Sequence, residues 1–361
     1  MDHLHAAEAL AERLDDPQRL RSIAGRLCFY FVAMDEYNRA LAAGQRALAL
    51  ATTSGAVDVQ LYAQTNLGLA YSAVGDFRQT LDLSRQMMAW LTGERLYTRA
   101  GQVGPLLGVI SRGHVAWSLA EMGDFAEGTG VGEEVMQLAV AVEHPYSIAI
   151  ALMWVGVLYC RQGALHQAIA VLERGLTFCQ TAYVPIFLPL IASVLGVAYA
   201  LAGRAPEALP LLEQALHRVA TERHMFAHAL VLTELSEALL LVGRVEKAST
   251  LAGRLLDLSL SLLGRGYQAH AYRLLGEVAM RRNHPDVDQA AAHYHRALAR
   301  VYGARTWAAA LRHGDASGTR AEPFVGRSSE VQTLHELLAQ VEHGQERGDN
   351  REPNGPGETV I

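Results

Sequence analysis

The sequence has very few lysine and cysteine residues. Of its 31 basic residues only Lys247 is a lysine, so any mechanism that needs a lysine must use that one. The three cysteines, Cys28, Cys160 and Cys179, are too few and too widely spaced for a disulfide framework or a zinc knuckle. The net charge is −6 and no basic block is found, which argues against nucleic acid as a partner.

An apolar leader is also missing from the sequence. The N-terminal stretch MDHLHAAEALAERLDD is charged throughout and lacks the apolar core of a signal peptide, which predicts a cytoplasmic protein. Residues 175–203 contain no charged side chain, a length that raises the question of a transmembrane helix. Pro185 and Pro189 interrupt this stretch, and its residues follow the repeat described next. We therefore expect a buried helix there and no membrane span.

What the sequence does have is a repeat of about 40 residues. Half of the residues are hydrophobic, with alanine and leucine dominant, which favours helices over sheets. A small residue recurs at steps of 40, 48, 40, 40, 40 and 42, and a second small residue precedes each of these by 12 or 14 positions. The two series are Ala40, Thr80, Gly128, Ala168, Ala208, Ala248 and Ala290, and Cys28, Gly68, Ala116, Gly156, Gly196, Ser236 and Gly276.

This spacing predicts a helix–turn–helix unit. Small side chains at the two positions allow the paired helices to approach closely, and we expect Gly68, Gly156, Gly196 and Gly276 to lie at such crossings. A glycine between the two helices ends the first one, because the left-handed conformation is readily adopted only by glycine. Such a unit cannot bury its own apolar face, so neighbouring units must stack. The turn glycines are Gly75, Gly123, Gly163, Gly203 and Gly243.

The motifs NLGLAYSAVGDFRQTL, WVGVLYCRQGALHQAI and VLGVAYALAGRAPEAL resemble the tetratricopeptide repeat, in a form with lengthened helices. The resemblance implies an all-α fold, a right-handed superhelical solenoid of about seven units. We expect the solenoid to occupy residues 21–312, with residues 1–20 forming a partial or capping repeat helix. The chain is similar in this respect to the repeat region of bacterial AAA-type ATPases and nucleotide cyclases that act in signalling.

A second motif resembles the start of such an ATPase domain. The sequence FVGR at 324–327 opens an apolar stripe at helical spacing, which predicts an amphipathic helix over 324–343. A phosphate-binding loop requires a lysine for the β and γ phosphates, and no lysine follows this motif. We therefore interpret the segment as a remnant. Residues 313–323 are predicted to be a flexible linker and residues 344–361 a disordered tail.

No other motif predicts catalysis or a cofactor. The stretch GTGVGEE (128–134) could be a phosphate loop, but its glycines fall on the small positions of a second helix, so we interpret it as a loosened repeat helix. His224 and His228 are one helical turn apart, yet no third metal ligand is evident. We expect no enzymatic activity, no cofactor and no metal site.

The resemblance also implies a concave surface lined by the first helices of the units. In the register of the family, an apolar and aromatic groove would be formed by Phe29, Tyr62, Leu69, Trp117, Met153, Val157 and Val197. Toward the last unit this surface becomes charged, with His270, Arg273, Glu277 and Arg281. Such a groove suits an apolar helix or peptide of a protein partner, which predicts an interaction scaffold or regulatory module. Two alternatives stay open: part of this face is core between long helices, or the chain is a regulatory fragment of a signalling ATPase or cyclase.

Overall fold

The structure, a computed structural model, describes residues 2–34, 36–100, 104–222, 228–261 and 264–302. Over these residues the chain forms fifteen α-helices and two short 3₁₀ helices, with a single isolated bridge between Arg99 and Leu106 in place of any sheet. The predicted all-α solenoid is thereby confirmed. The predicted linker, the FVGR helix and the C-terminal tail lie outside the described residues.

Helix α1 (Asp2–Arg13) is followed by seven helix pairs. The first helices of the pairs are α2 (Pro17–Ala33), α4 (Val57–Val74), α6 (Leu107–Met122), α8 (Pro145–Gln162), α10 (Leu188–Leu201), α12 (His228–Leu241) and α14 (Arg265–Arg281). The second helices are α3 (Tyr37–Ser54), α5 (Phe77–Trp90), α7 (Phe125–Val142), α9 (Leu165–Thr181), α11 (Ala205–Glu222), α13 (Val245–Ser261) and α15 (Val287–Tyr302). Each helix packs against its pair partner, and the first helices of successive units pack against one another.

The turns within five of the seven pairs are made by the predicted glycines. Gly163 has a φ of 79° and follows the last residue of α8, where it ends the helix in the left-handed conformation. Gly75, Gly123, Gly203 and Gly243 have φ values of 73° to 85° at the same place in their units. Each turn also has the same backbone hydrogen bond, in which the residue after the glycine donates its N–H to a carbonyl group in the last turn of the first helix. In the α8–α9 turn, for example, the Ala164 N–H donates to the Tyr159 carbonyl (2.9 Å).

The glycines of the first helices lie at close contacts between helices. A Cβ added to Gly156 would come within 2.3 Å of Leu172 on α9, and one added to Gly196 within 2.5 Å of Leu212 on α11. In the last unit a Cβ on Gly276 would meet Tyr294 at 2.4 Å. Gly68 differs, because its closest neighbour is His114 on the next unit's first helix, at 3.0 Å.

The longer step of 48 residues corresponds to the connection between α5 and α6. This connection contains the 3₁₀ helix η1 (Gly93–Tyr97), and its two ends are fixed by the fully buried side chains of Leu91 and Leu106. The second 3₁₀ helix, η2 (Pro185–Phe187), precedes α10 in the uncharged stretch of the sequence. Among the described helices none is both long enough and apolar enough to span a membrane.

Helix α7, which contains GTGVGEE, is continuous rather than loosened. Gly128 and Gly132 are buried, and a Cβ on either would come within 3.2 Å of the Leu158 side chain on α8. These glycines therefore make room for a leucine of the next unit, and the packing compensates for their low helix propensity.

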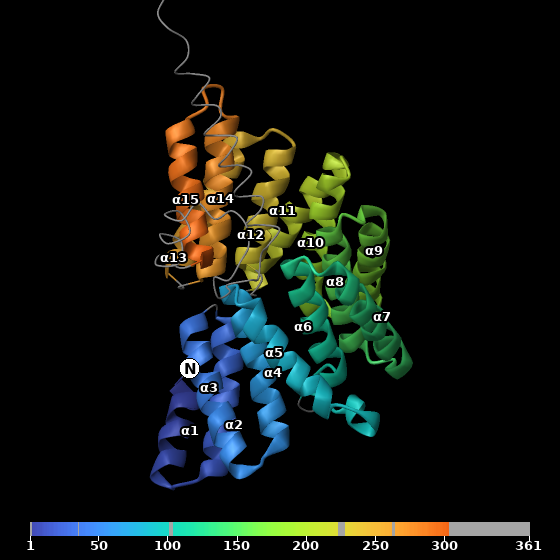
Figure 1. The fold of residues 1–361 in the computed structure, drawn as a ribbon, viewed down its shortest axis with the longest axis vertical. Coiled ribbons are helices and arrows are strands. Elements are labelled where there is room, and N and C mark those ends of the chain that lie inside the picture. Colours follow the sequence, from blue (N-terminus) through green and yellow to red (C-terminus); the bar gives the residue numbers. More distant parts are fainter. Residues whose placement is uncertain (1, 35, 101–103, 223–227, 262–263, 303–361) are drawn as a thin grey trace, which may run out of the picture.

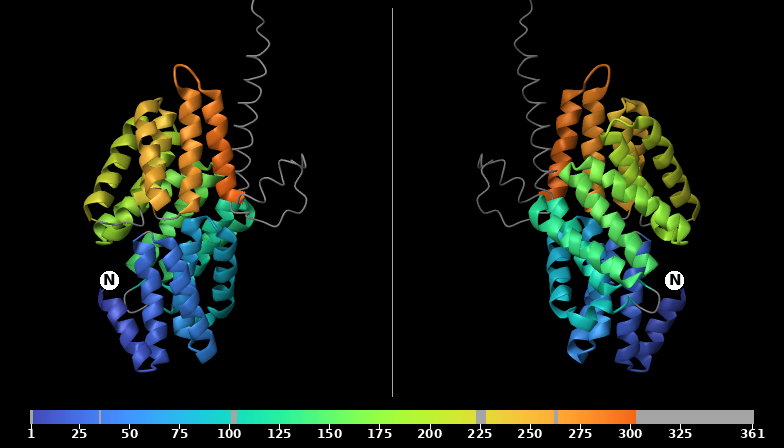
Figure 2. Two further views of the ribbon diagram at one scale, coloured as in Figure 1. Left: turned by 90° about the vertical axis from the view of Figure 1, so that its left-hand side faces the viewer. Right: turned by 90° about the vertical axis from the view of Figure 1, so that its right-hand side faces the viewer.

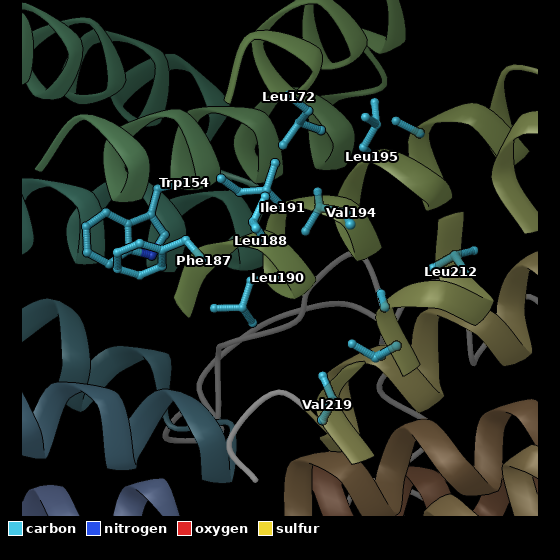
Figure 3. Close-up of a cluster of buried hydrophobic side chains, with 14 of the residues drawn as sticks. Trp154, Leu172, Phe187, Leu188, Leu190, Ile191, Val194, Leu195, Leu212 and Val219 are labelled. Atoms are coloured by element: carbon cyan, nitrogen blue, oxygen red, sulfur yellow. The ribbon is translucent and has the colours of Figure 1, made fainter. Parts of the chain in front are cut away.

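The largest buried cluster lies in the middle of the solenoid. Figure 3 shows it extending from Trp154 on α8 through Ile191 and Leu195 on α10 to Leu212 on α11. Trp154 occupies the space above Gly113, where an added Cβ would lie 1.8 Å from its ring. Helix α10 is at the centre of this cluster, with every residue from Leu188 to Ala200 buried. The uncharged stretch is therefore core between repeats only where it forms α10, and it is not the single buried helix expected from the sequence, because Tyr183 in the connection from α9 is 87% exposed.

The stack of units curves back on itself. Figure 1 shows the N-terminal helices and the C-terminal helices α12–α15 on one side of the molecule, with α6–α9 on the other, and Figure 2 shows the same arrangement from both sides. Helix α14 contacts α4, although the two are separated by about five units of sequence. Both are first helices of their units, so the first helices line the inside of the curve.

We predict that Gly196→Leu destabilises the protein by roughly 1–3 kcal/mol or more, because the added side chain must overlap Leu212. Gly253→Ala on α13 is the matched control, since a Cβ there meets no atom within 4 Å. The control should stabilise the protein by about 0.5–1 kcal/mol through helix propensity. Urea unfolding of both variants checks this, and equal midpoints would contradict the close crossing.

Candidate interaction surface on the inner face

One repeat position defines the inner face of the first helices. Starting from Phe29 and moving by the repeat steps, the same position is occupied by Leu69, Trp117, Val157, Val197, Glu237 and Glu277. The first five of these are apolar, and the last two are acidic. The residue at this position therefore changes from apolar to acidic along the solenoid.

The exposed apolar part of this face lies on the first two units. Phe29 on α2 leaves 49% of its surface exposed. Tyr62 on α4 is half-buried and packs over Gly25, where an added Cβ would lie 3.1 Å from its ring. Leu69 is also half-buried, packed against the cluster formed with α2. These three predicted groove residues remain accessible to a partner.

Trp117 on α6 is held in a fixed orientation. Its ring packs edge-to-face on Phe77, with centroids 5.6 Å apart. Its indole N–H donates to a carboxylate oxygen of Glu121 (3.2 Å), which also accepts from Arg161 of the next unit (3.0 Å). Because both ends of the ring are anchored, Trp117 offers a rigid aromatic surface to the inner face.

The predicted groove does not continue through α10. Met153 and Val157 on α8 are half-buried and pack against the core. Val197 on α10 is only 5% exposed, so its inclusion in an accessible groove was wrong. The repeat register gives the direction of this side chain correctly, but neighbouring helices enclose α10 on every side. The accessible apolar surface thus ends at α8.

The charged part of the inner face is organised in ion pairs. Arg273 on α14 donates to Glu237 on α12 (2.9 Å) and also pairs with Glu277, which pairs in turn with Arg281 (3.2 Å). Burial raises the pKa of Glu237, but the charges of Arg273 and Arg161 outweigh this effect and hold that pKa below its ordinary value. Each acidic group of this set thus has an arginine partner, which offsets the cost of burying its charge.

Glu234 on α12 is the exception. The pKa of its carboxyl is raised from 4.5 to about 7, chiefly by burial and to a smaller extent by the charges of Glu237 and Glu121, against the lowering effects of a hydrogen bond from Ser193 and of Arg161. Its Oε2 atom is buried without a hydrogen-bond partner among the described residues. Glu234 occupies the repeat position that Trp154 and Val194 hold in the two preceding units, where the side chains are buried apolar core.

Four of these charged residues were not predicted from the sequence: Glu121, Arg161, Glu234 and Glu237. A signal was available, because Glu121 and Arg161 are 40 residues apart at one repeat position, and Glu237 follows Val197 by the same step. Side chains of opposite charge at equivalent positions of neighbouring units are expected to lie close together. No spacing in the sequence indicates that the Oε2 atom of Glu234 would be buried without a hydrogen-bond partner.

The remaining candidates contribute no site. His224 lies outside the described residues, and burial together with Arg254 lowers the pKa of His228. Within the described ranges, no group of three or more His, Cys, Asp or Glu side chains is placed to hold a metal ion.

The sequence matches no protein-family model and no curated protein. Among solved structures, the chain is similar to a signal transduction ATPase with numerous domains from Pyrococcus horikoshii, which has a tetratricopeptide repeat sensor. The TM-score is 0.49 at 12% identity, and the match covers 93% of this chain but only 45% of that one. A tetratricopeptide repeat protein from Parabacteroides merdae has a TM-score of 0.45 at 13% identity, covering 89% of this chain and 98% of that one.

A third similar structure is BtubC from P. vanneervenii, with a TM-score of 0.40 at 18% identity, covering 66% of this chain and 97% of that one. With TM-scores below 0.5, these similarities assign no function or partner to the chain. The repeat architecture rests on the helix pairs described above.

We predict that Glu234→Gln changes the pH dependence of stability. Between pH 4.5 and about 7 the folded protein retains a proton on Glu234 that the unfolded chain releases, so stability falls as the pH rises through this window. The variant should therefore be nearly as stable as the wild type at pH 5 and more stable at pH 8, by about 1–2 kcal/mol. Urea unfolding at both pH values measures this difference. Glu213→Gln on α11, at an exposed position, is the matched control for the same substitution.

Proposed function

We propose that this chain is a non-enzymatic protein-interaction module, a scaffold or regulator that acts in the cytoplasm. Its partner supplies an apolar helix or peptide that lies along the inner face of α2, α4, α6 and α8. The observation that supports this most is the exposure of Phe29. Its side chain lies at the inner-face repeat position and leaves 49% of its surface exposed. An aromatic residue so exposed on the inner face is unpaired within the solenoid, and a partner would bury it.

The shape and chemistry of the inner face favour an elongated partner. Phe29, Leu69, Trp117 and Val157 recur along successive first helices, so their spacing suits apolar side chains that recur along a helix or an extended segment. The ion pairs of α12 and α14 are already satisfied within the protein, so they contribute less to affinity than the apolar part. Binding energy is therefore expected to concentrate at the N-terminal half of the face.

The absence of enzymatic activity is part of the proposal. The one lysine, Lys247, lies exposed on the second helix α13 and away from the inner face. Because Lys247 lies within a helix, it is not the lysine of a phosphate-binding loop. The FVGR motif supports a second possibility, in which the chain is a regulatory part of a signalling ATPase or nucleotide cyclase. Sequencing the DNA on either side of the coding region for an ATPase or cyclase segment distinguishes the two.

We predict that Phe29→Glu abolishes capture of the partner, because it places a charge in an apolar contact. The matched control is Val140→Glu on α7, which alters an apolar residue of similar exposure (52%) on a second helix. Both variants and the wild type are used as bait in native lysate, and captured proteins are quantified by mass spectrometry. A partner that is retained by Phe29→Glu and lost with Val140→Glu would show that the binding surface lies elsewhere.

A further inference from the structure

A cleft lies where the two ends of the solenoid meet. Its volume is about 420 Å³, and its walls come from the first two units on one side and the last two on the other. Residues more than 180 positions apart in the sequence thus line one cavity. The lining residues are Asn38, Leu41, Tyr71, Val74, Asp76, Leu260, Arg265, Gln268 and Arg300.

Packing between the two ends holds this cleft in shape. The backbone of Gly264, at the start of α14, lies against the ring of Tyr37, the first residue of α3, so that an added Cβ would be 3.6 Å from it. Tyr37 is only 3% exposed. On the same side Gln268 is buried and donates to the Ser259 carbonyl (3.0 Å), which fixes the start of α14 against the end of α13. The cleft is therefore built by ordered elements.

The cleft contains two arginines that have no acidic partner. Arg265 and Arg300 make no ion pair with any described residue, whereas Arg161 and Arg273 on the inner face are both paired. The one carboxyl group in the lining, Asp76, is engaged elsewhere, since it accepts from the Gln79 N–H (3.2 Å) at the start of α5. The lining has a surplus of positive charge and of hydrogen-bond donors.

The rest of the lining is apolar. Leu41 and Val74 come from the first units, and Leu260, which is 44% exposed, comes from the end of α13. A ligand that fills the cleft would cover these three side chains while its charged group reaches the guanidinium groups. Guanidinium groups bind carboxylates and phosphates through paired hydrogen bonds.

We propose that this cleft binds a small anionic ligand, a phosphate monoester or a carboxylate, that has an apolar substituent. The anion pairs with Arg265 and Arg300, and the substituent lies against Leu41, Val74 and Leu260. Because the cleft is shared by the two ends of the solenoid, the bound ligand also holds α4 and α14 together. This site is separate from the proposed partner surface, and neither proposal depends on the other.

The test is calorimetric titration of the full chain with phenyl phosphate, phenylacetate and inorganic phosphate at constant ionic strength. We expect saturable binding of one of the two aromatic anions, and which one binds identifies the anion. Arg265→Gln and Arg300→Gln should each weaken it about tenfold or more, since each removes a charged hydrogen bond. The matched control is Arg254→Gln on α13, another exposed arginine without an ion pair among the described residues, and it should bind as the wild type does.

The apolar contact is tested separately. Leu260→Ser should weaken binding of the aromatic anion but leave inorganic phosphate unchanged. Circular dichroism of each variant confirms that the exposed substitutions preserve the helices. Slower hydrogen exchange in α4 and α14 upon ligand addition would support the bridging role. Absence of saturable binding by either aromatic anion, or unchanged affinity in both arginine variants, would overturn the proposal.

Discussion

The close approach of the two helices within each unit is the constraint on which the rest of the structure depends. At this crossing one residue must be small for its partner, sixteen positions later, to fit, as with Gly156 and Leu172 or Gly196 and Leu212. Where the first residue is larger, the second is small, as with Cys28 and Gly44, whose added Cβ would lie 2.8 Å from the sulfur. In the second, third and sixth units both positions are small (Gly68 and Ser84, Ala116 and Gly132, Ser236 and Ala252). Side chains of the next unit fill the space at two of these, His114 against Gly68 and Leu158 against Gly132.

The stacking of the units does not fix the type of residue at the repeat position of Phe29. The side chains at this position form the inner face. Apolar side chains there are tolerated whether they are exposed like Phe29 or covered like Val197. Charged side chains are tolerated only in pairs, because a half-buried charge without a partner loses its hydration. Glu237 with Arg273 satisfies this condition. Glu234 has no such ion pair among the described residues, and burial raises the pKa of its carboxyl group.

The helices, turns and close crossings could be predicted because their causes are local or recur with the repeat. The turn glycine acts in the same way in five units, and the small residues of the first helices lie at close contacts between helices. Exposure could not be predicted in this way: the register assigns Val197 to the inner position, but its burial depends on the helices packed around α10, namely α8, α9, α11 and α12. The contact between α4 and α14, and the cleft with Arg265 beside it, depend on curvature summed over five units. No spacing in the sequence predicts this summed curvature.

The same two helices serve both the inner face and the cleft. Helix α4 carries Leu69 on the inner face and Val74 in the cleft, and α14 carries Arg273 on the inner face and Arg265 in the cleft. A change in the distance between α4 and α14 must therefore alter both surfaces. If a ligand in the cleft and a partner on the inner face favour different distances between α4 and α14, linkage requires that each lowers the affinity of the other by the same factor.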